Sequence, residues 1–264
     1  GQRVMLHDNG LIWAAAEGEA LTWMNTKVDG KPVAQRAGYA VEIQALWYNA
    51  VEYTLAVAKK QGDKEFVAEW KALPEIIKNS FLGCFWLSEG YLADYVNHDE
   101  VNKFIRCNMT VACGLDFIML DDEKLVRTIM TIRDHLLTPR GLRTLSPRNI
   151  HYKSNYNEDQ RSQDLASRNG SAWVWPLMFY VKACFAIGGE RYVDDARKLL
   201  EAFDAELQTK CVGSISERFE GDPPHNPRGS VSHATSVAGL LYINMRINEY
   251  APKKRKTTKK AAPK

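Results

Sequence analysis

The 264 residues contain 45% hydrophobic and 25% charged side chains, ordinary values for a globular protein that exclude an intrinsically disordered chain. The formal net charge is +3, but residues 251–264 carry seven lysines and arginines and no acid, so residues 1–250 have a net charge of −4. This acidic balance argues against nucleic acid as a partner. The sequence has no run of about 18 apolar residues, which argues against a membrane partner.

Both ends of the chain and its cysteines bear on its setting. The first 24 residues lack the basic-then-apolar layout of a secretory signal, and the chain starts at Gly1, so we expect an N-terminal portion of the same polypeptide to precede it. Residues 251–264 are predicted to be a disordered basic tail, either solubilising or, at 252–256, a nuclear-import signal. The five cysteines are odd in number, widely spaced and without a Cys-x-x-Cys pair, which predicts a reducing, cytoplasmic setting and no metal or other cofactor.

Residues 1–81 are predicted to form two long helices after an irregular start. Glycine and proline punctuate residues 1–38. Apolar residues then recur at helical spacing over 41–57, and this helix should stop at Gly62. A second helix is predicted over 63–81; its first residue, an aspartate, is a good N-cap, and Pro74 should kink it or end it early.

The rest of the chain alternates further helices with polar segments. We predict a short strand or loop pair over 85–96, helices over 100–118, 121–137, 172–187, 191–210 and 233–249, and irregular structure over 139–170 and 213–230. A polar segment as long as 139–170 is usually functional inside a compact domain. Seven helices with hardly any strand predict an all-α fold of helix pairs, with residues 1–250 forming one domain.

Three predicted loop regions collect residue types that sugar-binding sites use. They are 21–25 with 47–49, 141–145 with Tyr152, and 213–225. Aromatic rings can lie flat on the apolar faces of a pyranose, while carboxylates, amides and guanidinium groups bind its hydroxyls. Aromatic residues at helical spacing are more often packed in a core, and this alternative stays open for Trp47.

Five motifs occur in the order found in one enzyme family. They are Leu21-Thr-Trp-Met-Asn25, Gly38-Tyr-Ala-Val-Glu-Ile-Gln-Ala-Leu-Trp-Tyr-Asn-Ala50, Leu137-Thr-Pro-Arg-Gly-Leu-Arg-Thr-Leu-Ser-Pro147, Ile215-Ser-Glu217, and Gly221-Asp-Pro-Pro-His225 followed by Pro227-Arg-Gly229. Through these motifs, spread over residues 10–250, the chain resembles the amylo-α-1,6-glucosidase domain of glycogen debranching enzymes. The resemblance implies an (α/α)6 barrel, of which this chain would be the C-terminal portion. It also implies hydrolysis of the α-1,6 branch-point glucose of glycogen with inversion.

Inverting hydrolysis needs two carboxyl groups on opposite faces of the sugar, about 6.5–9.5 Å apart, one to protonate the leaving oxygen and one to activate water. The resemblance gives the general-base position to Glu217. It places Asn25 where the family has the aspartate that acts as general acid, and a carboxamide cannot donate a proton at neutral pH. Asp29 and Glu19 lie near Asn25 in sequence, so either of them is an alternative acid.

The resemblance and the residue types together predict the surroundings of this pair. The expected substrate-binding residues are Trp23, Arg36, Glu42, Trp47, Tyr48, Asn49, Asn108, Arg143, Tyr152, Asp164, Trp173, Trp175, Asp222 and His225. We expect Asn25 and Glu217 to face each other across one cleft. Five of the other residues should line it: Trp23, Trp47, Tyr48, Arg143 and Trp173.

The family's His-Gln-Gly-Thr-Val-Trp-Pro-Trp is matched here by Arg168-Asn-Gly-Ser-Ala-Trp-Val-Trp175, and this departure, together with Asn25, bears on activity. One interpretation is an inverting α-glucosidase that acts on branched α-glucan with an impaired acid. A second is a catalytically silent paralog that binds α-glucan. A third, a helical scaffold for protein partners, would apply if the aromatic residues of the three loop regions were buried.

Overall fold

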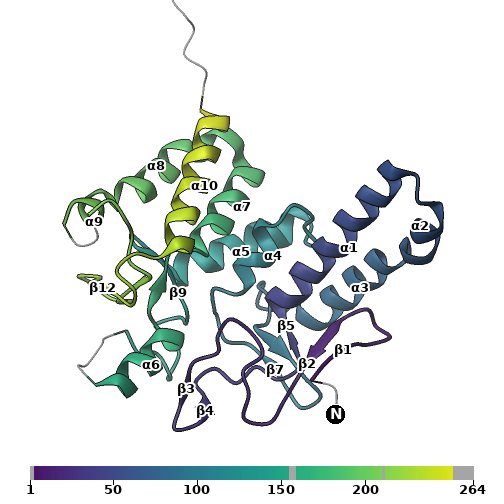
Figure 1. Cartoon of the computed structure of the whole chain (residues 1–264), viewed down its shortest axis with the longest axis horizontal. Coiled ribbons are helices and arrows are strands. Elements are labelled where there is room, and N and C mark those ends of the chain that lie inside the picture. Colours follow the sequence, from purple (N-terminus) through teal and green to yellow (C-terminus); the bar gives the residue numbers. More distant parts are fainter. Residues whose placement is uncertain (1–2, 155–158, 210–211, 252–264) are drawn as a thin grey trace, which may run out of the picture.

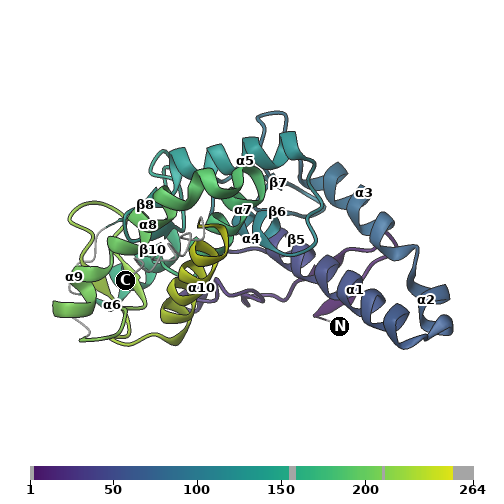
Figure 2. The ribbon, with the colours of Figure 1, turned by 90° about the horizontal axis from the view of Figure 1, so that it is seen from above.

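The computed structural model describes residues 3–154, 159–209 and 212–251, so the predicted basic tail lies outside the described residues except for Ala251. The helices are α1 (Val41–Gln61), α2 (Lys64–Trp70), α3 (Leu73–Phe85), α4 (Met109–Gly114), α5 (Asp122–His135), α6 (Gln160–Asn169), α7 (Leu177–Gly188), α8 (Val193–Glu201), α9 (Asp204–Thr209) and α10 (Ala234–Tyr250), with a 3₁₀ turn at Gly189–Tyr192. The strands are β1 (Val4–Leu6), β2 (Ile12–Ala14), β3 (Lys27–Val28), β4 (Lys31–Pro32), β5 (Tyr39–Ala40), β6 (Tyr95–Val96), β7 (Val101–Asn102), β8 (Leu137–Thr138), β9 (Gly141–Arg143), β10 (Ala172–Trp173), β11 (Arg218–Phe219) and β12 (Pro227–Arg228). The helices follow one another in a curved row, with α2 at one end and α9 at the other (Figures 1 and 2).

The first two helices begin and end where their sequence signals predict. Gly62 ends α1 in the left-handed region (φ 77°), where a residue without Cβ meets no clash. The side chain of Asp63 accepts a hydrogen bond from the backbone N–H of Phe66 and so caps α2. The predicted second helix ends early, as expected, because Pro74 lies in the first turn of a new helix, α3, where its missing N–H needs no partner.

The helix predicted over 100–118 is wrong for most of its length. The backbone of β7 is used in a ladder with β6, and the side chain of Asn102 accepts a hydrogen bond from the backbone N–H of Phe104. Only α4 is helical, and all six of its residues are buried. A helix that is buried on every side belongs in a core.

Three further predictions also differ from the structure. Helix α6 lies inside the segment predicted to be irregular, and Asp159 caps it by accepting a hydrogen bond from the Ser162 N–H. This helix is mostly polar, so it has no apolar stripe that periodicity could detect. Residues 172–173, predicted to be helical, form β10, and α7 starts only after Pro176. The helix predicted over 191–210 is divided into α8 and α9.

The fold is predominantly helical, and the prediction of an all-α chain is corrected by several small sheets. The largest is a five-stranded antiparallel sheet in the order β12–β11–β10–β9–β8. Its register places Trp173 opposite Arg218 on one side and opposite Leu142 on the other. Strands of two or three residues are too short to show an alternating pattern, so the sequence does not reveal them. The described helices form the curved row of Figure 2, and a closed barrel of helix pairs stays a prediction.

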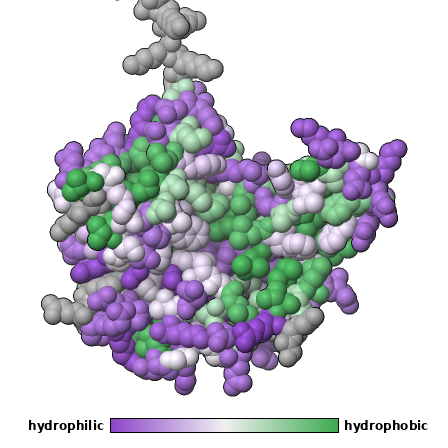
Figure 3. All heavy atoms as spheres, viewed as in Figure 1, coloured by the Kyte–Doolittle hydropathy of each residue, from purple (hydrophilic) through white to green (hydrophobic). Residues whose placement is uncertain are grey.

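The centre of the molecule is formed by α4 and α7, which contact each other and also α1, α5 and α10. Apolar side chains also reach the surface between α10 and α1 on the face shown in Figure 3. Exposed apolar residues include Leu46 and Val57 on α1 and Leu241 and Met245 on α10. These two helices therefore each present an apolar stripe that no described element covers.

The packing of α4 on α7 depends on the absence of a side chain at Gly114. A Cβ there would lie 2.3 Å from the carbonyl oxygen of Phe179. We expect Gly114→Ala to lower the free energy of unfolding by about 1–3 kcal/mol, because the backbones must separate. The matched control is Gly83→Ala in α3, where a Cβ meets nothing within 4 Å and helix propensity favours alanine. Thermal unfolding of both variants checks this; equal midpoints would contradict the packing argument.

Candidate active site

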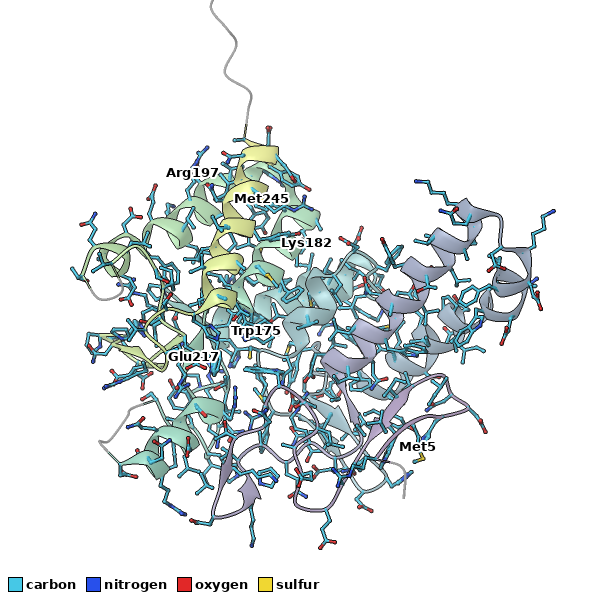
Figure 4. All side chains as sticks on the ribbon, in the orientation of Figure 1. Met5, Trp175, Lys182, Arg197, Glu217 and Met245 are labelled. Carbon is cyan, nitrogen blue, oxygen red and sulfur yellow. The ribbon has the colours of Figure 1, made fainter. Side chains whose placement is uncertain are left out.

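Three tryptophans from two segments form an aromatic pocket, defined here as the cavity of about 260 Å³ lined by Trp23, Trp173, Trp175, Met178, His233, Thr235 and Ala238. The ring of Trp23 stands edge-on to both others, with centroids 5.3 Å from Trp173 and 4.9 Å from Trp175. Trp173 is fixed because its indole N–H donates to the backbone carbonyl of Ser167 (3.0 Å). His233, Thr235 and Ala238 bring the N-terminal end of α10 to the pocket. In the view of Figure 4, Trp175 and Glu217 are both seen near this end of the helix.

Arg168, in the last turn of α6, forms one wall of this region. Its guanidinium carbon lies 4.9 Å from the ring centre of Trp23 and 4.8 Å from that of Trp173, in cation–π contact with both. Its Nε donates to Thr26 Oγ1 (2.9 Å), and one Nη approaches Asn25 Oδ1 (3.4 Å). The arginine is buried, whereas Asn25 is exposed to solvent.

Glu217 lies directly before β11, whose first residue, Arg218, is opposite Trp173 in the sheet. Its Oε2 accepts hydrogen bonds from Arg218 (2.9 Å) and from the backbone N–H of Ser230 (3.1 Å), and its side chain is 20% exposed. Within the described residues its Oε1 accepts no hydrogen bond. Gly229 allows the close approach, since a Cβ there would lie 2.0 Å from Oε2. The carboxylate is thus oriented by one oxygen and leaves the other for a ligand.

Two arginines connect Asn25 and Glu217 to the same indole ring, that of Trp173. Arg168 contacts both Asn25 and Trp173, and the guanidinium carbon of Arg218 lies 5.6 Å from the same indole ring. The structure therefore brings both predicted catalytic positions to the neighbourhood of one tryptophan. Their separation in the inverting range of about 6.5–9.5 Å stays a prediction.

Arg143, Tyr152 and Asp222 come together in a second cluster that joins β9 to two loops. Arg143 Nε donates to Tyr152 Oη (3.2 Å) and to the carbonyl of Gly221 (2.8 Å), and the hydroxyl of Tyr152 donates to Asp222 (2.9 Å). Burial and the acceptor on Asp222 raise the pKa of Tyr152 to about 12. Beside this cluster, His225 makes a hydrogen bond through Nδ1 with the carbonyl of Glu220 (3.0 Å). Direct contact of these residues with sugar stays a prediction.

A buried ionic network lies behind Trp23 and contains three of the predicted substrate-binding residues. The indole N–H of Trp23 donates to Asn108 (2.7 Å), which donates to Asp94 (2.7 Å), and Arg36 joins Asp94 (2.8 Å) to Glu42 (2.6 Å). Arg36, Glu42 and Asn108 are each at most 5% exposed. Burial alone would lower the pKa of Arg36, but the two carboxylates raise it above its ordinary value. In the structure these residues hold Trp23, and through it the aromatic pocket, by way of the hydrogen bond from the indole to Asn108.

The Asn108 amide is expected to be necessary for this support. Asn108→Leu leaves the Trp23 indole N–H and a carboxylate oxygen of Asp94 without their partners, and each such loss costs about 1–3 kcal/mol. We expect the free energy of unfolding to fall by about 3 kcal/mol in urea denaturation. The matched control is Asn79→Leu on the exposed face of α3, which should change stability little. A loss no larger than that of the control would contradict the network's role.

Three predicted binding residues on α1 are not brought to the aromatic pocket. The indole N–H of Trp47 donates to the carbonyl of Gly10 (3.1 Å), and the hydroxyl of Tyr48 donates to Glu52 (3.1 Å). Asn49 bonds both backbone groups of Phe117 through its amide. Tyr48 is buried, and Trp47 is half-buried against the core. Contact of these three residues with sugar stays a prediction, and both alternatives stay open for Trp47.

The other predicted acids are engaged at the surface. Asp164 on α6 accepts a hydrogen bond from Gln160 (2.9 Å). Asp29 forms an ion pair with Arg161, and Glu19 pairs with Lys27 (3.0 Å). The hydrogen bond and charge of Lys27 lower the pKa of Glu19, the opposite of what a general acid needs.

The described part of the chain contains cysteines, other possible metal ligands and helices of different lengths. No group of three His, Cys, Asp or Glu side chains there could hold a metal ion. Cys84, Cys107, Cys113 and Cys184 are free thiols, and Cys211 lies outside the described residues. None of the helices described is both long and apolar enough to cross a membrane.

Several residues of the site escape sequence reasoning. Arg168 and Arg218 flank Trp173, and His233 lines the aromatic pocket, yet each carries no local signal beyond its place in or near a motif. Asp94 and Arg106, which meet at 3.7 Å in the buried network, stand in segments predicted to be strand and helix. Their position inside apolar stretches is the signal that could have predicted a buried ion pair, because charged side chains are rarely buried unless they are paired.

An aromatic pocket beside an oriented carboxylate, on a fold of successive helices, is the kind of site that glycoside hydrolases use to hold and cleave sugars. The family model described as amylo-alpha-1,6-glucosidase matches residues 2–242, and the chain belongs to this family. The resemblance inferred from the five motifs is thereby confirmed.

Two curated relatives and one solved structure are similar to the chain. The chain is 25% identical over 232 residues to a glycogen debranching enzyme of Saccharomyces cerevisiae, an alignment that covers 69% of this chain and 15% of the relative. It is 26% identical over 191 residues to a periplasmic trehalase of Xanthomonas axonopodis, covering 70% and 29% of the two chains. The structure of the neutral trehalase of Saccharomyces cerevisiae superposes with a TM-score of 0.55 at 14% identity, covering 81% of this chain and 40% of that one, which shows a shared fold. The chain spans less than a third of either curated relative.

Proposed function

We propose that this chain binds branched α-glucan at the aromatic pocket and hydrolyses its α-1,6-linked glucose by inversion, with Glu217 as general base and without an efficient general acid. The observation that carries the proposal is that two arginines lie over the ring of Trp173: Arg168, which approaches Asn25, and Arg218, which donates to Glu217. The family's description supplies the substrate class. A cytoplasmic setting fits a glycogen-like substrate and belongs to the same proposal.

The chemistry of the two positions differs. Glu217 is oriented through Oε2 by Arg218 and Ser230, so that Oε1 can take a proton from water attacking the sugar. Asn25 is close to aspartate in size and can bind a hydroxyl, but it has no acidic proton to give to the leaving oxygen. Glucan should therefore bind well and react slowly.

A catalytically silent α-glucan-binding protein is the second candidate function, and the same asparagine favours it. Both candidates need the aromatic pocket for binding, and they differ only in whether Glu217 still delivers water. Substrates that need no protonated leaving group separate them.

Glucan binding is expected to depend on Trp175, which lines the aromatic pocket and is partly exposed. Trp175→Ala should weaken binding of a branched limit dextrin about tenfold in calorimetric titration, because the sugar loses the apolar surface of the indole. The matched control is Trp70→Ala on α2, whose ring stacks on Phe66. Equal affinities for the two variants, or no binding by the unmodified chain, would remove the support for a glucan site.

A further inference from the structure

Position 25 has a buried cation as its neighbour. One Nη of Arg168 lies 3.4 Å from Asn25 Oδ1, and Nε of the same guanidinium is bonded to Thr26, the next residue. The guanidinium is also held between Trp23 and Trp173, so it has little freedom to leave. Arg168 is 8% exposed, which limits screening by water.

The other charged groups near position 25 are engaged with partners of their own. On the strand side, Lys27 pairs with Glu19. On α6, Arg161 pairs with Asp29, and Asp164 accepts a hydrogen bond from Gln160. Across Trp173, Glu217 and Arg218 pair with each other. Among the described residues, Arg168 is thus the charged group that contacts residue 25.

A neighbouring arginine shifts the pKa of a carboxyl group in the direction opposite to the one that a general acid needs. A proton donor that works near neutral pH needs a raised pKa, as the acid of a glycosidase has. A guanidinium within about 4–6 Å stabilises the ionised carboxylate and lowers the pKa of an aspartate by about 1–3 units. The amide of asparagine can accept the arginine's hydrogen bond without this conflict.

We propose that Arg168 is a positioning residue that commits position 25 to accepting hydrogen bonds, so that restoring an aspartate there does not by itself restore a general acid. The inference rests on the proposed function, because it concerns the acid step of that reaction. Asn25 and Arg168 are therefore coupled: an aspartate at position 25 can act as general acid only when the cation at position 168 is removed as well.

The test compares Asn25→Asp, Arg168→Gln and the double variant in release of glucose from a branched limit dextrin between pH 4 and 8. The alkaline limb of kcat/KM reports the pKa of the acid in the free enzyme. In the double variant this limb should lie at least one pH unit higher than in Asn25→Asp, and glucose release at pH 7 should be at least tenfold faster. Arg168→Gln alone should give no such gain. Two controls in the Asn25→Asp background, Arg168→Lys, which keeps the cation, and Arg161→Gln, on the same helix, should leave the limb in place.

Hydrolysis of α-glucosyl fluoride, which needs no acid, is measured in every variant and separates the two claims. One outcome is that the variants hydrolyse the fluoride, but the alkaline limb of kcat/KM for limit dextrin is the same in Asn25→Asp and in the double variant. This outcome overturns the coupling of Asn25 to Arg168 and leaves the proposed function standing. Full recovery by Asn25→Asp alone also overturns the coupling. Absence of fluoride hydrolysis in all variants overturns the proposed hydrolysis and the inference with it. Thermal unfolding midpoints near that of the unmodified chain show that the Arg168 variants are folded, and Arg168→Met replaces Arg168→Gln if that variant is not.

Discussion

Replacing Glu217 by glutamine is expected to reduce hydrolysis of α-glucosyl fluoride by about 10²–10⁴-fold, the usual contribution of a general base. The substitution keeps the size of the side chain, and its amide oxygen can still accept from Arg218 and Ser230. The change removes only the ability to take a proton from water. Initial rates of fluoride release measure the effect.

The control for this variant is Glu201→Gln at the exposed end of α8, which should hydrolyse the fluoride at the unmodified rate. Glucan affinity should survive in Glu217→Gln, because the aromatic pocket is untouched. A Glu217→Gln protein as fast as the control would assign the base to another residue.

Replacing Arg36 by methionine is expected to cause the largest loss of stability, about 3–5 kcal/mol, because it leaves the carboxylates of Glu42 and Asp94 buried without their common cation. Both carboxylates are at most 3% exposed, so water cannot replace the arginine. Urea denaturation followed by circular dichroism measures the loss.

An exposed ion pair provides the comparison for Arg36. Lys103 pairs with Glu89 at 2.8 Å, and both side chains are open to solvent. Lys103→Met should leave the denaturation midpoint nearly unchanged, since surface pairs contribute little. Similar midpoints for the two variants would mean that the buried network does not stabilise the fold.

The helices that the sequence predicts well are those with local punctuation. Gly62 ends α1, Asp63 starts α2 and Pro74 opens α3, and each acts through its own backbone or side chain. The errors arise where tertiary contacts determine whether a segment is a helix or a strand. The predicted 100–118 helix yields to a strand ladder with β6, and the short strand β10 exists only because β9 and β11 lie on either side of it.

The candidate site follows the same division. Motif resemblance selects Trp23 and Trp173, whose rings are in contact, and Asn25 and Glu217, which are connected to Trp173 through Arg168 and Arg218. It also selects Trp47, although that indole packs against the backbone of Gly10. A motif records which residues occur together but not which way each side chain points. The two arginines beside Trp173 depend on the pairing of β10 with β11 and on the end of α6, which no local pattern predicts.

The anomer of glucose that the unmodified chain first releases from α-glucosyl fluoride, observed by proton NMR before mutarotation, tests the proposed inverting hydrolysis by Glu217. Fluoride departs without an acid, so Asn25 is no obstacle, and water delivered by Glu217 attacks the face opposite the leaving group. We expect β-glucose as the first product, released about 10²–10⁴-fold more slowly by Glu217→Gln. Release of α-glucose, or no hydrolysis by a chain that still binds glucan, would contradict this proposal.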